Sequence, residues 1–214
     1  MIKIDMHVHT HSSRCSMNFL NILKKTCLKK GILPIITDHD VMTKTDFGIP
    51  GEEISTSKGE FCGIFLNEEI KEKDIFEAFD KVKEQGGLIY IPHPFDWQRK
   101  RSLCKFGLLD SSEFIKKVDI VEIYNSRCIE QKPNEDAKTY AKSYNIVKGV
   151  GSDAHFFWEV GNAFLEIPEF DLDNPKEFLK LLSKAQSENF YCKRSNPNNM
   201  LVCSKLSKRI KKLM

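Results

Sequence analysis

Short apolar runs alternate along this chain with segments whose apolar residues recur at helical spacing. Leu20, Leu23 and Cys27 lie three or four residues apart, which predicts a helix over 18–30, and Gly31 ends it. The run Ile32–Ile36 is typical of a buried strand. The same patterns predict strands over 2–7, 32–36, 51–55, 61–66, 88–92, 119–124 and 146–150, and further helices over 74–84, 111–117, 134–144 and 174–185.

This alternation of strands and helices is typical of an α/β fold with a mainly parallel sheet or barrel. Polar clusters stand at the carboxyl ends of several predicted strands, and in α/β barrels that face carries the site. We therefore expect residues distant in sequence to meet at one pole. Residues 1–190 form the expected catalytic barrel. Residues 191–214 form a basic C-terminal tail, expected to pack on the barrel or to trail from it.

Composition indicates an ordinary globular chain. It has 214 residues, 41% hydrophobic and 29% charged, and its net charge of +3 does not by itself indicate a nucleic-acid partner. Seven cysteines stand at scattered spacings without a CxxC pair, which favours reduced thiols in a cytosol. No apolar run approaches the ~18–20 residues of a membrane span, and the N-terminus does not resemble a signal peptide. The expected location is the cytoplasm, without membrane contact.

Histidines carry the strongest functional signal. Of the six in the chain, five lie at predicted strand ends: His7, His9, His39, His93 and His155. Residues two apart on a strand point to one side, so the pair His7 and His9, like the pair Asp153 and His155, can face one cation. Glu52 and Glu53 lie near another strand end. Imidazole suits transition metals such as zinc and iron, and carboxylates can bridge two ions.

Each motif has an ordinary structural explanation when it is taken alone. Asp38-His39-Asp40 could begin a helix, and Asp153-Ala154-His155 could be a surface turn. Their joint placement at successive strand ends predicts instead a polynuclear metal site. We expect Asp5 and Asp38 to orient ligand histidines from behind.

These motifs resemble those of the polymerase and histidinol phosphatase (PHP) family of metal-dependent phosphoesterases. The resemblance spans residues 1 to about 160 and rests on Asp5-Met6-His7-Val8-His9-Thr10, Thr37-Asp38-His39-Asp40, Gly51-Glu52-Glu53-Ile54-Ser55-Thr56, His93-Pro94 and Gly151-Ser152-Asp153-Ala154-His155. It implies a distorted (β/α)7 TIM-like barrel that binds two or three divalent metal ions, with zinc, manganese or iron as the expected metals.

The resemblance also implies a ligand arrangement. His7, His9, Glu53 and Asp153 would surround one metal, and Glu53 would bridge to a second metal that His93 binds. His39 and His155 would belong to a third metal. Glu60 is a further candidate ligand, with a solvated turn glutamate as the alternative.

One position departs from the family pattern, in which an Asp or His often follows the His-x-His pair. Here Arg14 and Cys15 occupy that region, and a guanidinium has no free acceptor for a metal. Cys15 could bind as a thiolate, but a buried apolar cysteine is the favoured interpretation, and His11 is another possible ligand. This departure favours two metals over three.

The implied reaction is attack on phosphorus by a metal-bound hydroxide. We assign catalytic roles to Asp153, His39 and His155, with one of the two histidines protonating the leaving group. Arg99, Arg101 or Arg14 could clamp a substrate phosphate. The alternative for the 95–101 segment is a solvated basic loop with Trp97 as a packed lid.

Three functions remain open from the sequence. The first is a phosphoesterase whose partner is a small phosphate ester or a nucleotide. The second is an amidohydrolase-type enzyme that cleaves C–N bonds, although no Lys stands where such enzymes bridge their metals. The third is a non-catalytic barrel subunit of a nucleic-acid complex, which would not need so full a ligand set. Aromatic interleaving that would support a nucleic-acid partner is lacking in the basic tail, and the oligomeric state is not predicted.

Overall fold

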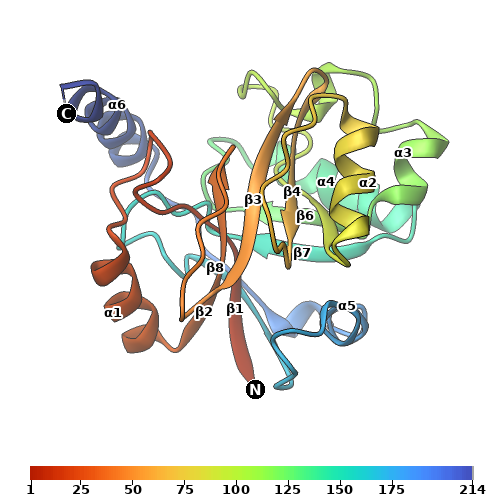
Figure 1. Cartoon of the computed structure of the whole chain (residues 1–214), viewed down its shortest axis with the longest axis horizontal. Coiled ribbons are helices and arrows are strands. Elements are labelled where there is room, and N and C mark those ends of the chain that lie inside the picture. Colours follow the sequence, from red (N-terminus) through yellow and green to blue (C-terminus); the bar gives the residue numbers. More distant parts are fainter. Residues whose placement is uncertain (214) are drawn as a thin grey trace.

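The computed structural model describes residues 1–213, except for the side chains of 197–201, 203 and 213. The described chain forms one nine-stranded sheet in the order β7-β6-β5-β4-β3-β2-β1-β8-β9 (Figure 1). The strands are β1 (Ile2–Val8), β2 (Ile32–His39), β3 (Ile49–Thr56), β4 (Gly59–Ile64), β5 (Leu88–Ile91), β6 (Ile120–Asn125), β7 (Val147–Gly151), β8 (Ala163–Ile167) and β9 (Phe190–Cys192).

The sheet curls until its β7 edge reaches β1, which lies near its other end. Val8 and Ala154 form an isolated parallel bridge, and the His9 amide donates to the Ala154 carbonyl at 3.0 Å. In return the Ala154 amide donates to the carbonyl of His7 at 3.2 Å. The result is the nearly closed α/β barrel that the sequence predicts. Its closure places the end of β7 directly beside the end of β1.

Gly151 permits this close approach. A Cβ atom built on Gly151 would lie 2.3 Å from the Cβ of His7 and 2.4 Å from Oε1 of Glu122. Real Cβ atoms do not tolerate such distances, so any other residue here would push β7 away from β1 and β6. The glycine therefore sets the spacing between three strand ends that carry polar side chains.

The expectation of a mainly parallel sheet is only half right. The pairs β1–β2, β2–β3, β5–β6 and β6–β7 are parallel, whereas β3–β4, β4–β5, β1–β8 and β8–β9 are antiparallel. The reason is local for β3 and β4, because Ser57 and Lys58 form a tight turn that allows only a hairpin. Gly59 follows with a φ of 107°. The hairpin brings the end of β3 and the start of β4 to the same pole.

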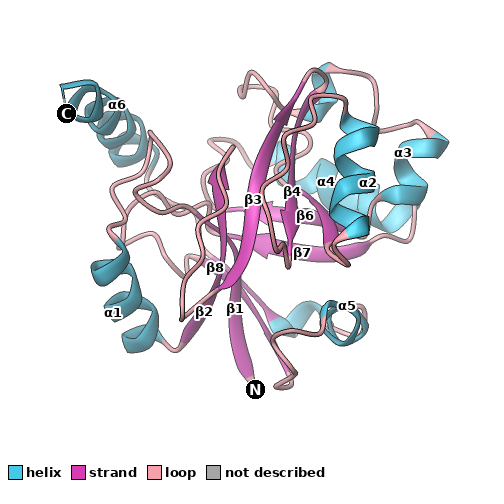
Figure 2. Cartoon of the chain, viewed as in Figure 1, coloured by secondary structure: helices cyan, strands magenta, loops and turns pink. Residues whose placement is uncertain are grey.

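Helices cover the outside of the barrel (Figure 2). They are α1 (Leu20–Lys30), α2 (Ile75–Glu84), α3 (Ser112–Lys117), α4 (Lys132–Ser143), α5 (Pro175–Leu182) and α6 (Pro197–Leu213), with short 3-10 turns at Leu103–Lys105 and Ser187–Asn189. Local chemistry sets their limits. Asp74 caps α2 by accepting from the amides of Phe76 and Glu77, and Gly31 ends α1 with a φ of 63°. None of the described helices is both long and apolar enough to cross a membrane.

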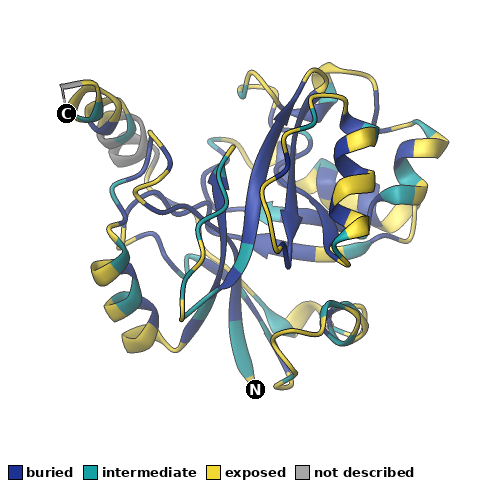
Figure 3. Ribbon diagram, in the orientation of Figure 1, coloured by how far each residue is buried: buried dark blue, intermediate teal, exposed yellow. Residues whose placement is uncertain are grey.

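The main core lies between the sheet and α2, α3, α4 and α5, and Figure 3 shows the strands as mostly buried. Phe61 of β4 meets Phe79 of α2 edge to face, with ring centroids 4.6 Å apart. Phe114 of α3 packs against the same ring at 5.5 Å. Burying each such side chain contributes about 1.5–3 kcal/mol. This core holds the strands whose ends carry the candidate site.

Candidate metal centre

The structure brings all eight candidate metal ligands to one pole of the barrel. They come from the ends of β1, β2, β3 and β7, from the start of β4, and from the loop after β5. All are buried except His39, whose side chain is 32% exposed. Their donor atoms form four groups within 4.8 Å: His7–His9–Asp153, His7–Glu53–His93, His39–Glu53–Glu60 and His9–His39–His155.

Glu53 lies at the centre of these groups. Its Oε1 lies 3.1 Å from Nε2 of His93, and its Oε2 lies 2.9 Å from Nδ1 of His39. Oε2 also lies 3.5 Å from Nε2 of His9. Glu60, the second residue of β4, has a carboxylate oxygen 3.9 Å from Nε2 of His93. The Glu53 carboxylate thus faces imidazoles on two sides.

Two buried carboxylate oxygens in this cluster accept no hydrogen bond from any described residue. They are Oε2 of Glu53 and Oδ1 of Asp153, whose side chains are each 1% exposed. Oδ1 lies 3.2 Å from Nε2 of His9, and Nε2 atoms of His7 and His9 lie 3.1 Å apart. Leaving such oxygens without a partner is costly. The donor set therefore fits divalent cations, which would satisfy the carboxylates and imidazoles together.

At Asp153, Glu53 and His9 the electrostatics favour the protonation states that bind metals, whereas neighbouring carboxylates outweigh burial and raise the pKa of His7 and His39. Burial raises the pKa of Asp153, but the Arg99 guanidinium and His7 outweigh it and hold that pKa well below its usual value. Burial likewise opposes ionisation of Glu53, but His39 outweighs it, so the pKa of Glu53 is lowered. Burial, assisted by His39, lowers the pKa of His9 to about 4. Two ionised carboxylates and a neutral imidazole are thus available as ligands.

Glu122 of β6 holds two of the candidate ligands in place. Its Oε1 lies 3.1 Å from Nδ1 of His7 and accepts from the Tyr90 hydroxyl at 2.7 Å. Its Oε2 accepts from the backbone amide of His93 at 2.7 Å. The contact with Nδ1 fixes the ring so that Nε2 of His7 faces the cluster. The sequence signal for this role was the place of Glu122 in a predicted strand, two residues before its end.

Asp5 and Asp38, which the sequence predicts to orient ligand histidines from behind, reach them through the backbone and through Ser13. The His7 amide donates to Asp5 at 3.4 Å, and the Ser13 hydroxyl that donates to Asp38 lies 3.3 Å from Nδ1 of His9. Asp5 accepts from the backbone amides of Ser152 and Gly161 at 2.9 and 2.8 Å. Asp38 accepts from the amide of Thr10 at 2.7 Å and from the hydroxyl of Ser13. Both carboxylates therefore fix the loops at the strand ends, where backbone donors need partners.

A cavity of about 450 Å³ opens beside the cluster, and its lining includes Cys15, His39, Arg99, Asp153, His155 and Lys208. We call it the histidine cavity. Arg99 is anchored there, because its Nη2 donates to Oδ2 of Asp153 at 2.5 Å and its Nε donates to Asp96 at 2.9 Å. Of the other predicted phosphate clamps, Arg101 donates to the Thr56 carbonyl at 3.4 Å and Arg14 is exposed. Neither Arg101 nor Arg14 is among the described residues that line the cavity.

The basic C-terminal segment forms α6 and adds Lys205 and Lys208 to the lining of the histidine cavity. Lys211 of this helix donates to the carbonyls of His11 and Ser13. These contacts hold the helix against the loop that follows β1. The sequence indicated the positive charge of this tail but gave no signal of where it docks.

Backbone conformation is unusual at two candidate ligands. His93 has a φ of 31° and Asp153 has a φ of 54°, both on the left-handed side that L-residues rarely adopt. In each case the chain turns sharply just after a strand, and the turn directs the side chain into the cluster.

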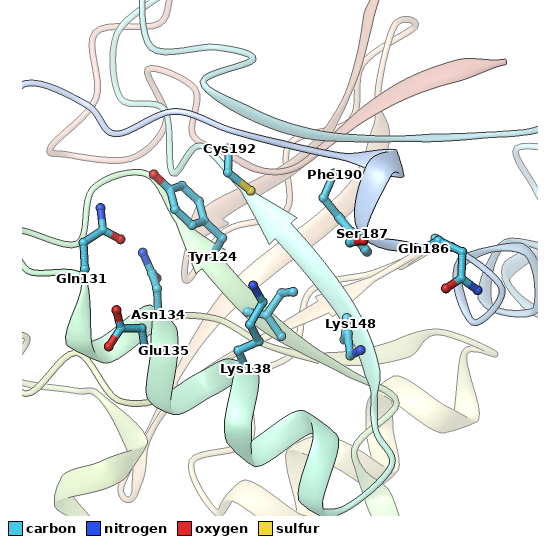
Figure 4. Close-up of a pocket in the computed structure, with 12 residues that line it drawn as sticks. Tyr124, Gln131, Asn134, Glu135, Lys138, Lys148, Gln186, Ser187, Phe190 and Cys192 are labelled. Atoms are coloured by element: carbon cyan, nitrogen blue, oxygen red, sulfur yellow. The ribbon is translucent and has the colours of Figure 1, made fainter.

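A second cavity, of about 530 Å³, has a separate set of lining residues (Figure 4). We call it the α4–β9 cavity, because α4, the outer side of β6 and β7, and β9 line it. Tyr124, Glu135, Lys138, Lys148 and Cys192 are among its lining residues. None of the candidate metal ligands lines it.

Comparison with known proteins tests whether this chain belongs to the PHP family that its motifs resemble. The family model described as PHP-associated matches residues 131–187. The fold resembles a two-domain protein from Bacteroides vulgatus that contains a predicted PHP-like metal-dependent phosphoesterase. That match has a TM-score of 0.65 at 18% identity and covers 96% of this chain and 69% of the other. This chain belongs to the PHP domain family.

The PHP domain described here is also similar to an uncharacterized protein of Methanocaldococcus jannaschii. The two are 52% identical over 187 residues, which is 85% of this chain and 79% of the relative. A lesion-specific endonuclease from Pyrococcus furiosus shares the fold, with a TM-score of 0.62 at 16% identity over 92% of this chain and 59% of the endonuclease. Likeness at such low identity establishes a common fold and leaves the reaction to be argued from the site.

Proposed function

We propose that this PHP domain is a metal-dependent phosphoesterase that hydrolyses a small phosphate ester or a nucleotide. The observation that carries the proposal is the pair of unpartnered, buried oxygens on Glu53 and Asp153. Both oxygens lie near imidazole nitrogens, and Asp153 also lines the histidine cavity together with Arg99, Lys205 and Lys208. Structural metal sites are closed, whereas catalytic sites keep a position open to substrate. A metal cluster at the wall of a 450 Å³ cavity is of the second kind.

Glu53 is the residue that would join neighbouring cations. Its two oxygens face His93 and His39 separately, and it is common to two of the four donor groups. His7, His9 and Asp153 would hold one cation with it, and Glu60 and His39 contribute from the far side. When bound, divalent cations supply an acidified water and positive charge for the phosphoryl oxygens.

The chain itself supplies substrate binding. A guanidinium has five N–H donors in a planar fork, so the contacts of Arg99 with Asp96 and Asp153 leave donors for a phosphoryl oxygen. Lys205 and Lys208 add positive charge at the α6 side of the cavity. Cations beside a metal cluster favour an anionic phosphate ester over a neutral amide, which weighs against C–N bond hydrolysis.

Two histidines at the cavity wall could hold the proton that the leaving group requires. His39 is the most exposed of the candidate ligands and lines the cavity together with His155. Asp153 positions Arg99 through the 2.5 Å contact, so its proposed role is to hold both a cation and the phosphate clamp.

The test uses two adjacent glutamates of β3. Protein stripped with chelator and then given Mn²⁺, Zn²⁺ or Fe²⁺ separately should hydrolyse members of a panel that includes p-nitrophenyl phosphate, bis-p-nitrophenyl phosphate and nucleotides. Glu53→Gln should lower kcat/KM at least about 100-fold, since even residues behind metal ligands are worth 10–100-fold.

Glu52→Gln is the matched control. Glu52 points to the other side of β3, where its Oε2 accepts from the Ile70 amide at 3.0 Å, and it belongs to none of the donor groups. Its variant should keep the parental rate. Equal rates in the two variants, or a metal-reconstituted protein inert toward the whole panel, would contradict the proposed function.

A further inference from the structure

A cysteine sulfur lies within the histidine cluster. Sγ of Cys15 is 3.0 Å from Nε2 of His155, and both residues line the histidine cavity. The sequence favours a buried apolar cysteine at this position, as is found for Cys27, which packs with Leu23 and Ile32 in a small apolar core. Cys15 instead faces imidazoles. It is therefore chemically unlike the cysteines of the core.

His155 and its neighbours already form a donor group that lacks a further ligand. Ring nitrogens of His9, His39 and His155 lie within 4.8 Å of one another. Nδ1 of His155 lies 2.8 Å from the backbone oxygen of Asp153, which directs Nε2 toward Cys15. The unpartnered Oε2 of Glu53 approaches the same group, 2.9 Å from Nδ1 of His39. That buried oxygen lies 2.9 and 3.5 Å from ring nitrogens of His39 and His9, so two of the three imidazoles adjoin a carboxylate that a cation would satisfy.

The loop that carries Cys15 is fixed to the strand ends. The hydroxyl of Ser16 donates to the carbonyls of His155 and His9, at 2.9 and 3.1 Å. The amide of Met17 donates to the carbonyl of His155 at 2.9 Å. Asn18 donates from Nδ2 to the carbonyls of His9 and Ala154, at 2.9 and 3.1 Å. The sulfur is thus held beside His155 by backbone contacts, as a preformed ligand requires.

We propose that Cys15 binds a further divalent cation as a thiolate, together with His39 and His155. On binding, the S–H bond of Cys15 breaks, its proton leaves to solvent, and a sulfur–metal bond forms. A thiolate with imidazoles is a soft donor set, so this position selects zinc or ferrous iron over manganese and magnesium. The proposal rests on the metal centre proposed above but not on the reaction that the centre performs.

Cobalt(II) titration tests this without measuring activity. Co²⁺ bound by imidazole and carboxylate gives visible d–d bands, whereas a thiolate ligand adds an intense near-ultraviolet sulfur-to-cobalt charge-transfer band. The parent protein and Cys192→Ser should both show that band, because Cys192 is exposed and outside the cluster. Cys15→Ser should lose the band completely and bind about one ion fewer per chain, while keeping the d–d bands of the remaining sites.

Cys15→Asp is the second variant, because a carboxylate offers a hard oxygen in place of sulfur. It should regain the lost ion, show no charge-transfer band, and shift the preference of that position toward manganese. Cobalt bound by the parent with d–d bands alone would overturn the role of Cys15 and leave the metal centre standing. A parent that binds no cobalt would overturn both. Circular dichroism confirms that each variant is folded.

Discussion

The two cavities of this PHP domain differ in what their walls leave unsatisfied. The α4–β9 cavity is the larger, at about 530 Å³, and charged residues such as Glu135, Lys138 and Lys148 line it. The histidine cavity is smaller, at about 450 Å³, yet Asp153, which carries one of the two unpartnered oxygens, lines it. No described residue lining the α4–β9 cavity has a buried, unpartnered side-chain atom. Unmet bonding capacity, and not volume, marks where a ligand is required.

The largest expected difference between the two cavities is in the thermal stabilisation that metal addition gives. Saturating the chelator-treated protein at about 100 times the dissociation constant of one site stabilises it by about 2.7 kcal/mol, which raises Tm by roughly 5–10 °C. Asp153→Asn should abolish most of this shift, because the amide cannot replace an anionic ligand. Glu135→Gln, in the α4–β9 cavity, should retain it. Differential scanning calorimetry measures both. The same metal-induced rise in Asp153→Asn would place the cations elsewhere.

A smaller effect is expected from substituting Glu122, which lies behind the candidate ligands His7 and His93. Glu122→Gln removes the charge that contacts Nδ1 of His7 and weakens the hold on the loop at His93. Metal affinity should fall about 10–100-fold, as measured by competition with a chromophoric chelator. Glu135→Gln serves again as the control and should bind metal like the parent. Unaltered affinity in Glu122→Gln would mean that packing alone orients His7.

The smallest effect is expected at the rim of the histidine cavity. Lys208→Ala should raise KM for a phosphate ester by about 1.5–5-fold with kcat unchanged, because an exposed charge contributes roughly 0.2–1 kcal/mol. Lys212→Ala is the control, as Lys212 is exposed on the same helix but does not line the cavity. Steady-state kinetics at two ionic strengths distinguishes a charge effect, which salt weakens, from a change in helix docking. Equal KM values for both variants would remove α6 from substrate binding.

Much of the barrel was predictable because periodic apolar residues report local structure. The predicted helix over 74–84 corresponds to Ile75–Glu84, and the predicted strand over 119–124 to Ile120–Asn125. The strands β8 and β9 were not predicted. Ala163–Ile167 is short, and what makes it a strand is its antiparallel pairing with β1, a contact distant in sequence.

The candidate site likewise has parts that the sequence predicted and parts that depend on tertiary packing. That His7 and Asp153 would lie close followed from their places at strand ends, although metal binding by them stays a prediction. The sequence placed Glu122 in a predicted strand, two residues before its end, but its contact with His7 depends on the tight approach of β7 that Gly151 allows. Lys208 reaches the cavity only because α6 docks on the loop after β1. Such contacts are products of tertiary packing and leave no periodic signal.

The positive φ angles of His93 and Asp153 have a consequence for engineering this domain. An L-residue in the left-handed region is about 1–2 kcal/mol less favourable than one in the right-handed region, and glycine avoids that penalty. A selection for thermal stability alone would therefore favour glycine at these two positions and remove candidate ligands. At these residues, stabilising this PHP domain and preserving its candidate site are opposed aims. Screens for thermally stabilised variants therefore need a measurement of metal binding beside the melting curve.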